Sequence, residues 1–289
     1  MEYSYYPGCS LKGTARDYAQ AIERLLYKLN LNFIELPNWV CCGASPAHLP
    51  DEKAGLAISA LTITEALKYN RDLVVACAAC YNRLKTTNIF LEKKPESKIE
   101  IENLIESQLT GKIRIRHLLE VIIEDVKTEI IASKLKKSLQ GLKAACYYGC
   151  LLSRPEGMLE NDLVENPKMM DNIIEITGAT PVSWPYKTEC CGASFGVSEP
   201  KISLQLSGKI LKSARDNGAE CIIVACPLCH ANLDLRQLEI DKFYNDKFHL
   251  PIFYFPELLA IALGEEHQNL ALDKHIVDPL PLLKRKGFI

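Results

Sequence analysis

The pentapeptide Cys-Cys-Gly-Ala-Ser occurs twice in this chain, and its repetition constrains the fold more than any other feature. The two copies begin at Cys41 and Cys190, 149 positions apart. Each copy is followed by a Cys-x-x-Cys pair at the same distance and preceded by a Gly-Cys dipeptide. Since 289 residues suit two mid-sized domains, the repeat predicts two homologous domains with five cysteines each.

Strand and helix patterns follow the same order in both halves. Residues 73–76 and 222–225 are short apolar runs typical of buried strands, and each leads directly into a Cys-x-x-Cys pair. This order predicts an α/β fold of two domains related by a pseudo-two-fold, each a small sheet flanked by helices, with the cysteines at one sheet edge. Expected strands cover 2–6, 31–36, 73–76, 113–115, 144–148, 180–184, 222–225 and 252–255, and expected helices cover 14–29, 50–69, 117–135, 167–177, 199–217 and 257–263.

The expected domains are residues 1–140 and 141–289. The basic segment 134–143, which carries a glycine, separates them. Residues 92–112 are charged and irregularly patterned, with a short amphipathic piece over 101–109, and predict a surface insertion in the first domain.

Charge and composition bear on the cellular setting. A net charge of −2 gives no basic field, so nucleic-acid binding is not expected. No apolar run has the roughly 18 residues of a membrane span, and the N-terminus lacks the pattern of a signal peptide. These features predict a cytoplasmic protein. In that reducing compartment its 12 cysteines favour metal ligation over disulfides.

Five thiols per half exceed the four of a tetrahedral zinc site and favour an iron–sulfur centre with several metal atoms. A structural zinc site with one bystander thiol is the alternative. Gly8 is expected to let the backbone approach whatever Cys9 binds, and Gly43 and Gly192 to leave room for a cluster's sulfides.

The full spacing resembles a known family. Cys-x31-Cys-Cys-x34-Cys-x-x-Cys in the first half and Cys-x39-Cys-Cys-x34-Cys-x-x-Cys in the second resemble the cysteine-rich CCG domain. With both copies intact, the chain is similar to the B subunits of methanogen heterodisulfide reductases. The resemblance implies two non-cubane [4Fe-4S] clusters, one held by Cys9, Cys41, Cys42, Cys77 and Cys80, and the other by Cys150, Cys190, Cys191, Cys226 and Cys229.

The resemblance also implies an activity and partners. The substrate would be the coenzyme M–coenzyme B disulfide, clamped between the two clusters and reduced to two thiols by one electron from each. Electrons would arrive from a ferredoxin-like C subunit and a flavin-containing, electron-bifurcating A subunit, with hydrogenase or formate dehydrogenase beyond. Related domains occur in lactate, glycolate and fumarate oxidoreductases, so an electron-transfer subunit of that kind is a second possibility, and a structural zinc scaffold a third.

Several other residues are candidates for a role at the site. His230 follows Cys229 and could donate a proton to a departing thiolate, or hydrogen-bond a cluster sulfide or the backbone. His48 is a weaker candidate on the Cys42 loop. Because both coenzymes are anionic, nearby cations are candidate substrate-binding residues: Lys187, Arg154, Lys12 and Arg83.

The remaining cysteines and the tryptophans are given structural roles. Cys146 and Cys221 lie on predicted strands and are expected to pack as small apolar side chains. Trp39 and Trp184 precede the two Cys-Cys pairs and are expected to shield the clusters from solvent.

Overall fold

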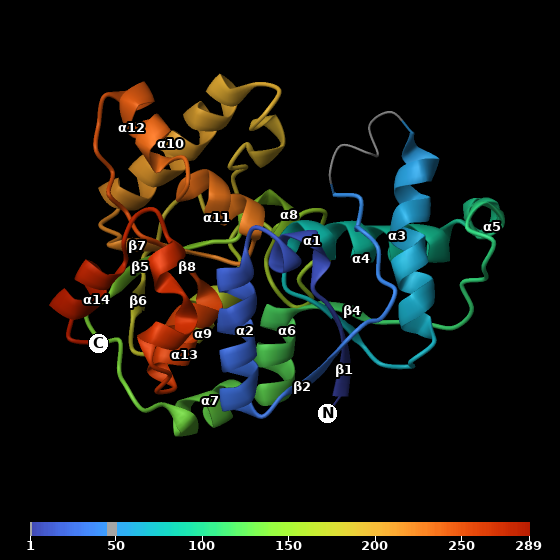
Figure 1. Cartoon of the computed structure of the whole chain (residues 1–289), viewed down its shortest axis with the longest axis horizontal. Helices are drawn as coiled ribbons and strands as arrows, with labels where there is room; N and C mark the ends of the chain where they lie inside the picture. The colour runs from blue at the N-terminus through green and yellow to red at the C-terminus, as the bar shows by residue number, and fades with distance from the viewer. Residues whose placement is uncertain (1, 45–50) are drawn as a thin grey trace.

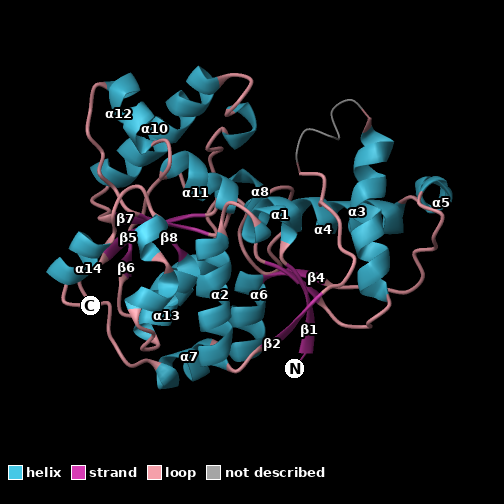
Figure 2. Cartoon of the chain, viewed as in Figure 1, coloured by secondary structure: helices cyan, strands magenta, loops and turns pink. Residues whose placement is uncertain are grey.

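The computed structural model describes residues 2–44 and 51–289, and it confirms the predicted fold class. Two four-stranded, all-parallel sheets lie in the two halves of the chain, flanked by helices (Figures 1 and 2). The first sheet has the order β2-β1-β3-β4 and the second the order β6-β5-β7-β8, so the halves share one topology. The strands are β1 (Glu2–Tyr6), β2 (Asn32–Glu35), β3 (Leu73–Val75), β4 (Ile115–His117), β5 (Lys143–Tyr147), β6 (Thr180–Pro181), β7 (Cys221–Val224) and β8 (Ile252–Tyr254).

Helices follow most strands and cover the sheets. All residues of the central strands β3 and β7 are buried, which explains why both segments are continuous apolar runs without alternation. The first half contains α1 (Gly8–Lys12), α2 (Arg16–Leu29), α3 (Glu52–Leu67), α4 (Ala78–Lys93), α5 (Pro95–Leu104), α6 (Leu118–Val121) and α7 (Thr128–Lys134). The second half contains α8 (Gly149–Ser153), α9 (Met169–Ile176), α10 (Pro200–Asp216), α11 (Pro227–Leu233), α12 (Gln237–Tyr244), α13 (Phe255–Ala262) and α14 (Leu280–Arg285).

Three sequence expectations differ from the structure. The single helix predicted over 117–135 is interrupted by a π-helical turn, Ile122–Val126, and by Lys127, whose φ of 66° cannot continue a helix. The strand predicted over 180–184 is only Thr180–Pro181, because beyond Val182 the next carbonyl of β5, that of Cys146, accepts from the Trp184 indole and not from a backbone N–H. The helices after the two Cys-x-x-Cys pairs, α4 and α11, were not predicted.

The two halves pack through equivalent helices. Helix α2 lies against α13 of the other half, and its counterpart α9 lies near α6, the counterpart of α13 (Figure 1). Two equivalent pairings of this kind are the mark of a pseudo-two-fold arrangement.

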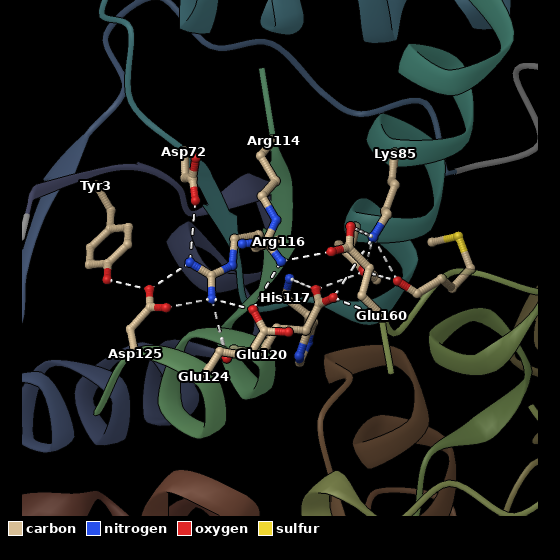
Figure 3. A network of polar contacts seen from close by, with 12 residues as sticks. Tyr3, Asp72, Lys85, Arg114, Arg116, His117, Glu120, Glu124, Asp125 and Glu160 are labelled. Carbon is tan, nitrogen blue, oxygen red and sulfur yellow. Dashed lines mark hydrogen bonds and ion pairs between the residues drawn. The ribbon is translucent and has the colours of Figure 1, made fainter. Parts of the chain in front are cut away.

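A buried polar network also ties the halves together (Figure 3). Arg116 on the edge strand β4 forms ion pairs with Asp125 at 2.6 Å and Glu124 at 2.8 Å. Lys85 of α4 pairs with Glu160 of the second half at 3.1 Å and donates to the carbonyl of Met158 at 2.8 Å. The carboxylates of this network are therefore neutralised by cations.

Among residues 2–44 and 51–289, no helix is both long enough and apolar enough to span a membrane.

Candidate functional site

All ten predicted cysteines lie at or beyond the carboxyl ends of strands or in the loops beside them. In the first half, β1 leads into α1, which carries Cys9, and β3 leads into α4, whose N-cap residue is Cys77. In the second half, β5 leads to Cys150 and β7 to Cys226 in the same way. Because the strands are parallel neighbours, one sheet edge gathers these cysteines.

Within the first set, the thiols form three contacts at hydrogen-bonding distance. Cys9 contacts Cys41, Cys42 contacts Cys80, and Cys80 contacts Cys77. The five residues predicted as one ligand set are thus brought together.

The second set repeats these contacts. Cys150 contacts Cys190, Cys191 lies 3.6 Å from Cys229 between sulfur atoms, and Cys229 contacts Cys226. The longer spacing between Cys150 and Cys190 therefore does not displace Cys150 from its set.

One further contact joins the two sets. Cys77 and Cys226, equivalent residues of the two halves, lie within hydrogen-bonding distance of each other. At the outer side, Cys9 and Cys41 are exposed, and Cys150 and Cys190 are partly exposed. Six thiols thus form one chain of contacts across the midline, Cys42–Cys80–Cys77–Cys226–Cys229–Cys191, and the more exposed pairs Cys9–Cys41 and Cys150–Cys190 complete the array.

The surroundings favour thiolate at one cysteine beside each of the two Cys-Cys-Gly turns. The hydrogen bond from Cys80 lowers the pKa of Cys42 to about 7 although burial opposes it, and the Tyr6 hydroxyl adds to the effect. The hydrogen bond from Cys150, with the N–H of Gly192, lowers the pKa of Cys190 to about 6. Thiolate is the form that binds metals.

Two glycines allow the backbone to approach the thiols. Gly8 and Gly149 have φ values of 69° and 67°. A Cβ atom would lie 3.2 Å from the Cys80 sulfur at Gly8 and 3.3 Å from the Cys229 sulfur at Gly149. Gly8 was expected to permit close approach to whatever Cys9 binds, and the structure shows the approach directed at Cys80.

Gly43 and Gly192 were expected to leave room for a cluster's sulfides, but the structure gives a different reason for glycine at these positions. Both have positive φ, which favours glycine. A Cβ atom at Gly192 would meet the backbone of Ser203 at 3.0 Å, and one at Gly43 would meet Gly55 and Ile58. These glycines face helices α10 and α3, and not the space between the thiols.

Sequence reasoning missed two tyrosines at the centre of the sets. Tyr6 lies among Cys9, Cys41, Cys42 and Cys80, which raise its pKa further beyond the effect of burial. Tyr147 has the equivalent place in the second set, and its hydroxyl donates to the Glu189 carbonyl at 2.6 Å. Their common spacing before the two Gly-Cys dipeptides was the available signal.

His230 is buried, and its ring stacks on Tyr254 with centroids 4.2 Å apart. Its Nε2 donates to the carbonyl of Ile252 at 3.1 Å, and burial holds its pKa well below the ordinary value. The first half has a ring contact at the equivalent positions with the residue types exchanged, but there Tyr81 meets His117 edge to face with centroids 5.5 Å apart. The structure thus gives His230 the backbone hydrogen bond that was its alternative role, and its proton-donor role stays a prediction.

The four predicted cations differ in how far their charge is already paired. Lys187 is buried, pairs with Asp171 at 2.7 Å and donates to a carbonyl. Lys12 pairs with Glu35 at 2.5 Å and Arg154 with Glu165 at 2.8 Å, both at the surface. Among the described residues, Nε and Nη2 of Arg83 are buried without a hydrogen-bond partner. This arrangement favours Arg83 as an anion-binding group over Lys187.

Cys146 and Cys221 lie fully buried in the hydrophobic core of the second half. Trp184 is buried, and its indole donates to the Cys146 carbonyl at 3.2 Å, whereas Trp39 packs edge-on against Tyr6. His48 lies outside the described residues.

Both halves of the sequence match one known protein family. The model of the CCG family, a cysteine-rich domain, matches residues 3–85 and again residues 144–234. The chain belongs to this family. The two matches span both five-cysteine sets, which explains their equivalent contacts.

Relatives of similar length include subunits of fumarate reductases and of heterodisulfide reductases. An 8-methylmenaquinol:fumarate reductase membrane anchor subunit from Wolinella succinogenes is 29% identical, covering 97% of this chain and 99% of its own length. The B subunit of a ferredoxin/F(420)H(2)-dependent CoB-CoM heterodisulfide reductase from Methanosarcina acetivorans is 28% identical, covering 98% and 96%. A hypothetical protein from Helicobacter pylori has the same fold, with a TM-score of 0.76 over 96% of this chain and 52% of its own, at 17% identity.

The donor set fits iron–sulfur clusters. Soft thiolates converge in fives, two glycines keep Cβ atoms away from sulfur, and buried apolar residues surround the array. Each set therefore offers the ligands that an iron–sulfur cluster requires.

Proposed function

We propose that this chain is the disulfide-reducing subunit of a heterodisulfide reductase, acting on the coenzyme M–coenzyme B disulfide. The observation that carries the proposal is the contact between Cys77 and Cys226, which makes two equivalent thiol sets neighbours. Cleavage of a disulfide to two thiols requires two electrons and two protons. Two non-cubane [4Fe-4S] clusters, when bound, would supply one electron each.

The ligand sets are those predicted from the sequence. The first set would hold one cluster and the second set the other. The exposed ends at Cys9 and Cys41, and the partly exposed ends at Cys150 and Cys190, leave a side of each set open to a small molecule. The hydroxyl of Tyr6 lies beside the first set, where it donates to the Val40 carbonyl at 2.9 Å and helps to lower the pKa of Cys42.

Arg83 is the cation that we propose binds an anionic group of the substrate. It lies three residues after Cys80 on α4, and two of its nitrogens have no partner among the described residues. A sulfonate, phosphate or carboxylate would satisfy both nitrogens with charge-assisted hydrogen bonds. Lys12 and Arg154, near Cys9 and Cys150, are the second-choice groups because each already has a carboxylate partner.

The alternative is an electron-transfer subunit of a fumarate-reductase-type complex. The Wolinella relative favours it, since its identity and coverage are within a few per cent of those of the methanogen relative. The test is thiol release from the heterodisulfide by the anaerobically purified, iron-replete chain with reduced viologen. Stoichiometric release of both thiols supports the proposal. If the reduced chain gives up electrons but releases no thiol, the electron-transfer alternative holds.

The same proposal implies partner proteins. We propose that electrons reach the array from a ferredoxin-like C subunit fed by a flavin-containing A subunit, with hydrogenase or formate dehydrogenase beyond. Co-purification of the tagged chain with iron–sulfur and flavin proteins from its native cells tests this assembly.

A further inference from the structure

Two histidines and an aspartate from different halves of the chain converge beside α11, apart from the ten cysteines. Asp17 comes from α2, His230 from α11, and His275 from the segment after a 3-10 turn at Leu272–Lys274. Their potential ligand atoms all lie within 4.8 Å of one another. The two imidazole rings meet edge to face with centroids 4.8 Å apart.

The outer hydrogen bonds of both imidazoles orient them as metal ligands are oriented. Nε2 of His275 donates to the buried carboxylate of Glu257 at 2.9 Å, and Nε2 of His230 donates to the Ile252 carbonyl at 3.1 Å. Such bonds to a carboxylate or carbonyl fix the tautomer of a metal-binding histidine and leave Nδ1 with its lone pair. Among the described residues, Nδ1 of His275 is buried without a hydrogen-bond partner.

The carboxylate of Asp17 is available to bind a cation. Among the described residues, Asp17 forms no ion pair with a lysine or arginine, and the nearby Lys274 pairs instead with Asp273 at 2.7 Å. The first half differs at the equivalent place. There Glu120, the counterpart of Glu257, faces the ammonium of Lys85 and not an imidazole (Figure 3).

We propose that Asp17, His230 and His275 form a mononuclear site for a divalent transition metal, with zinc as the reference ion. Two imidazoles and one carboxylate are a common set of three protein ligands for such ions. Zinc bonds of about 2.0–2.2 Å place ligand atoms roughly 3.3 Å apart, so small side-chain rotations complete the site. Asp17 and His230 line a cavity of about 300 Å³, where a fourth ligand would bind, and the cations Arg16 and Lys274 line it too.

A metal bound at this site would link the two halves of the chain. Asp17 belongs to the first half, and both histidines belong to the second. A metal that binds only the closed arrangement stabilises it by mass action. In addition, a metal on Nδ1 would displace the second proton that His275 carries when it is charged, while Nε2–H stays on Glu257, so the buried Glu257 keeps a positive neighbour.

The test uses the full chain, reconstituted anaerobically with iron and sulfide and then dialysed against Zn²⁺. Metal analysis is expected to give one zinc per chain in addition to the iron. Zinc K-edge X-ray absorption should show nitrogen and oxygen ligands only, with imidazole scattering and bonds of about 2.0–2.1 Å.

Matched variants locate the zinc. His275→Asn and Asp17→Asn should each weaken zinc binding at least tenfold, with iron content unchanged. His249→Asn is the control, because His249 is exposed with a φ of 45°, a conformation that asparagine adopts readily. Asp17 is only partly buried on a long helix, so its variant keeps the fold even if His275→Asn does not.

Three results would overturn the proposal: no retained zinc, sulfur in the zinc shell, or zinc affinity unchanged by Asp17→Asn. None of these readouts depends on thiol release. A negative result would therefore reject the zinc site without bearing on the proposed reductase activity.

Discussion

The thiols of Cys77 and Cys226 lie within hydrogen-bonding distance although they belong to different cysteine sets. Each precedes the helix after the third strand in sequence of its own sheet, so the two residues are equivalents. A contact between equivalents lies beside the pseudo-two-fold axis. A change at either residue therefore reaches both sets.

Cys77→Ala should remove the cluster of the first set and disturb the second. We expect iron and acid-labile sulfide to fall to about half, because one of two five-thiolate ligand sets is broken. The EPR spectrum of the remaining cluster should shift, since its Cys226 ligand loses a neighbour. Cys221→Ala is the control, a buried core thiol that contacts neither set. Full iron in Cys77→Ala would reject the ligand assignment.

Gly149→Ala should lower the iron content of the second set. The new methyl group would lie 3.3 Å from the Cys229 sulfur and 3.4 Å from the Tyr147 hydroxyl. Gly141→Ala is the matched control, because Gly141 also has a positive φ but no atom within 4 Å of its Cβ position. Both variants lose about 1 kcal/mol of stability to backbone strain. Equal iron contents, measured by metal analysis, would show that thiol crowding is not the reason for this glycine.

Arg83→Met should raise the KM for the heterodisulfide roughly 10- to 100-fold, since a hydrogen bond to a charged group contributes about 1.5–3 kcal/mol. Iron content should stay constant. Arg285→Met, at an exposed position near the C-terminus, serves as the control in the same thiol-release assay. An unchanged KM would remove Arg83 from the substrate site.

Lys187→Met should destabilise the protein and leave KM unchanged. The substitution leaves Asp171 as a buried carboxylate without its 2.7 Å partner, a loss typically of about 3–5 kcal/mol. The exposed pair of Lys12 and Glu35 contributes at most about 1 kcal/mol, so Lys12→Met should unfold at nearly the wild-type urea concentration. A stable Lys187→Met variant with a raised KM would instead restore Lys187 to the substrate site.

His117 should make the protein less stable in acid. Burial lowers its pKa to about 4, although the Ala76 carbonyl, which accepts from Nε2 at 2.9 Å, opposes the shift. The unfolded chain therefore binds more protons between pH 6.5 and 4, and stability falls by up to about 1.4 kcal/mol per pH unit as pH decreases through this range. His117→Gln should flatten this dependence in urea titrations. Parallel curves for the two proteins would contradict the assignment.

The repeated cysteine spacing, with the repeated apolar runs, was sufficient to predict both sheets and which five thiols come together in each half. Short apolar runs before the Cys-x-x-Cys pairs located the central strands, because a buried parallel strand has no polar face. The helix over 117–135 was harder to predict, since its apolar pattern continues through the π-helical turn and Lys127. The wider π-helical turn and the positive φ of Lys127 interrupt the helix, and neither leaves a mark in the apolar pattern.

The residues around the thiols were predicted less well for a different reason. Lys187 is close to Cys190 in sequence, but its place is decided by Asp171, which approaches from another helix. Asp17 and His275 lie at opposite ends of the chain, and no motif joins them. Contacts of this kind depend on how distant segments pack together. Local sequence patterns do not predict that packing.

The exchanged pairs, Tyr81 with His117 and His230 with Tyr254, have a consequence for the origin of this chain. The shared topology and the contact between Cys77 and Cys226 give the protein the form of a homodimer fused into one polypeptide. In a true homodimer both subunits must carry the same residue at every position. In a single polypeptide that restriction does not apply, so histidine and tyrosine can exchange places in one half while the two rings stay neighbours, and the two copies are free to differ in function.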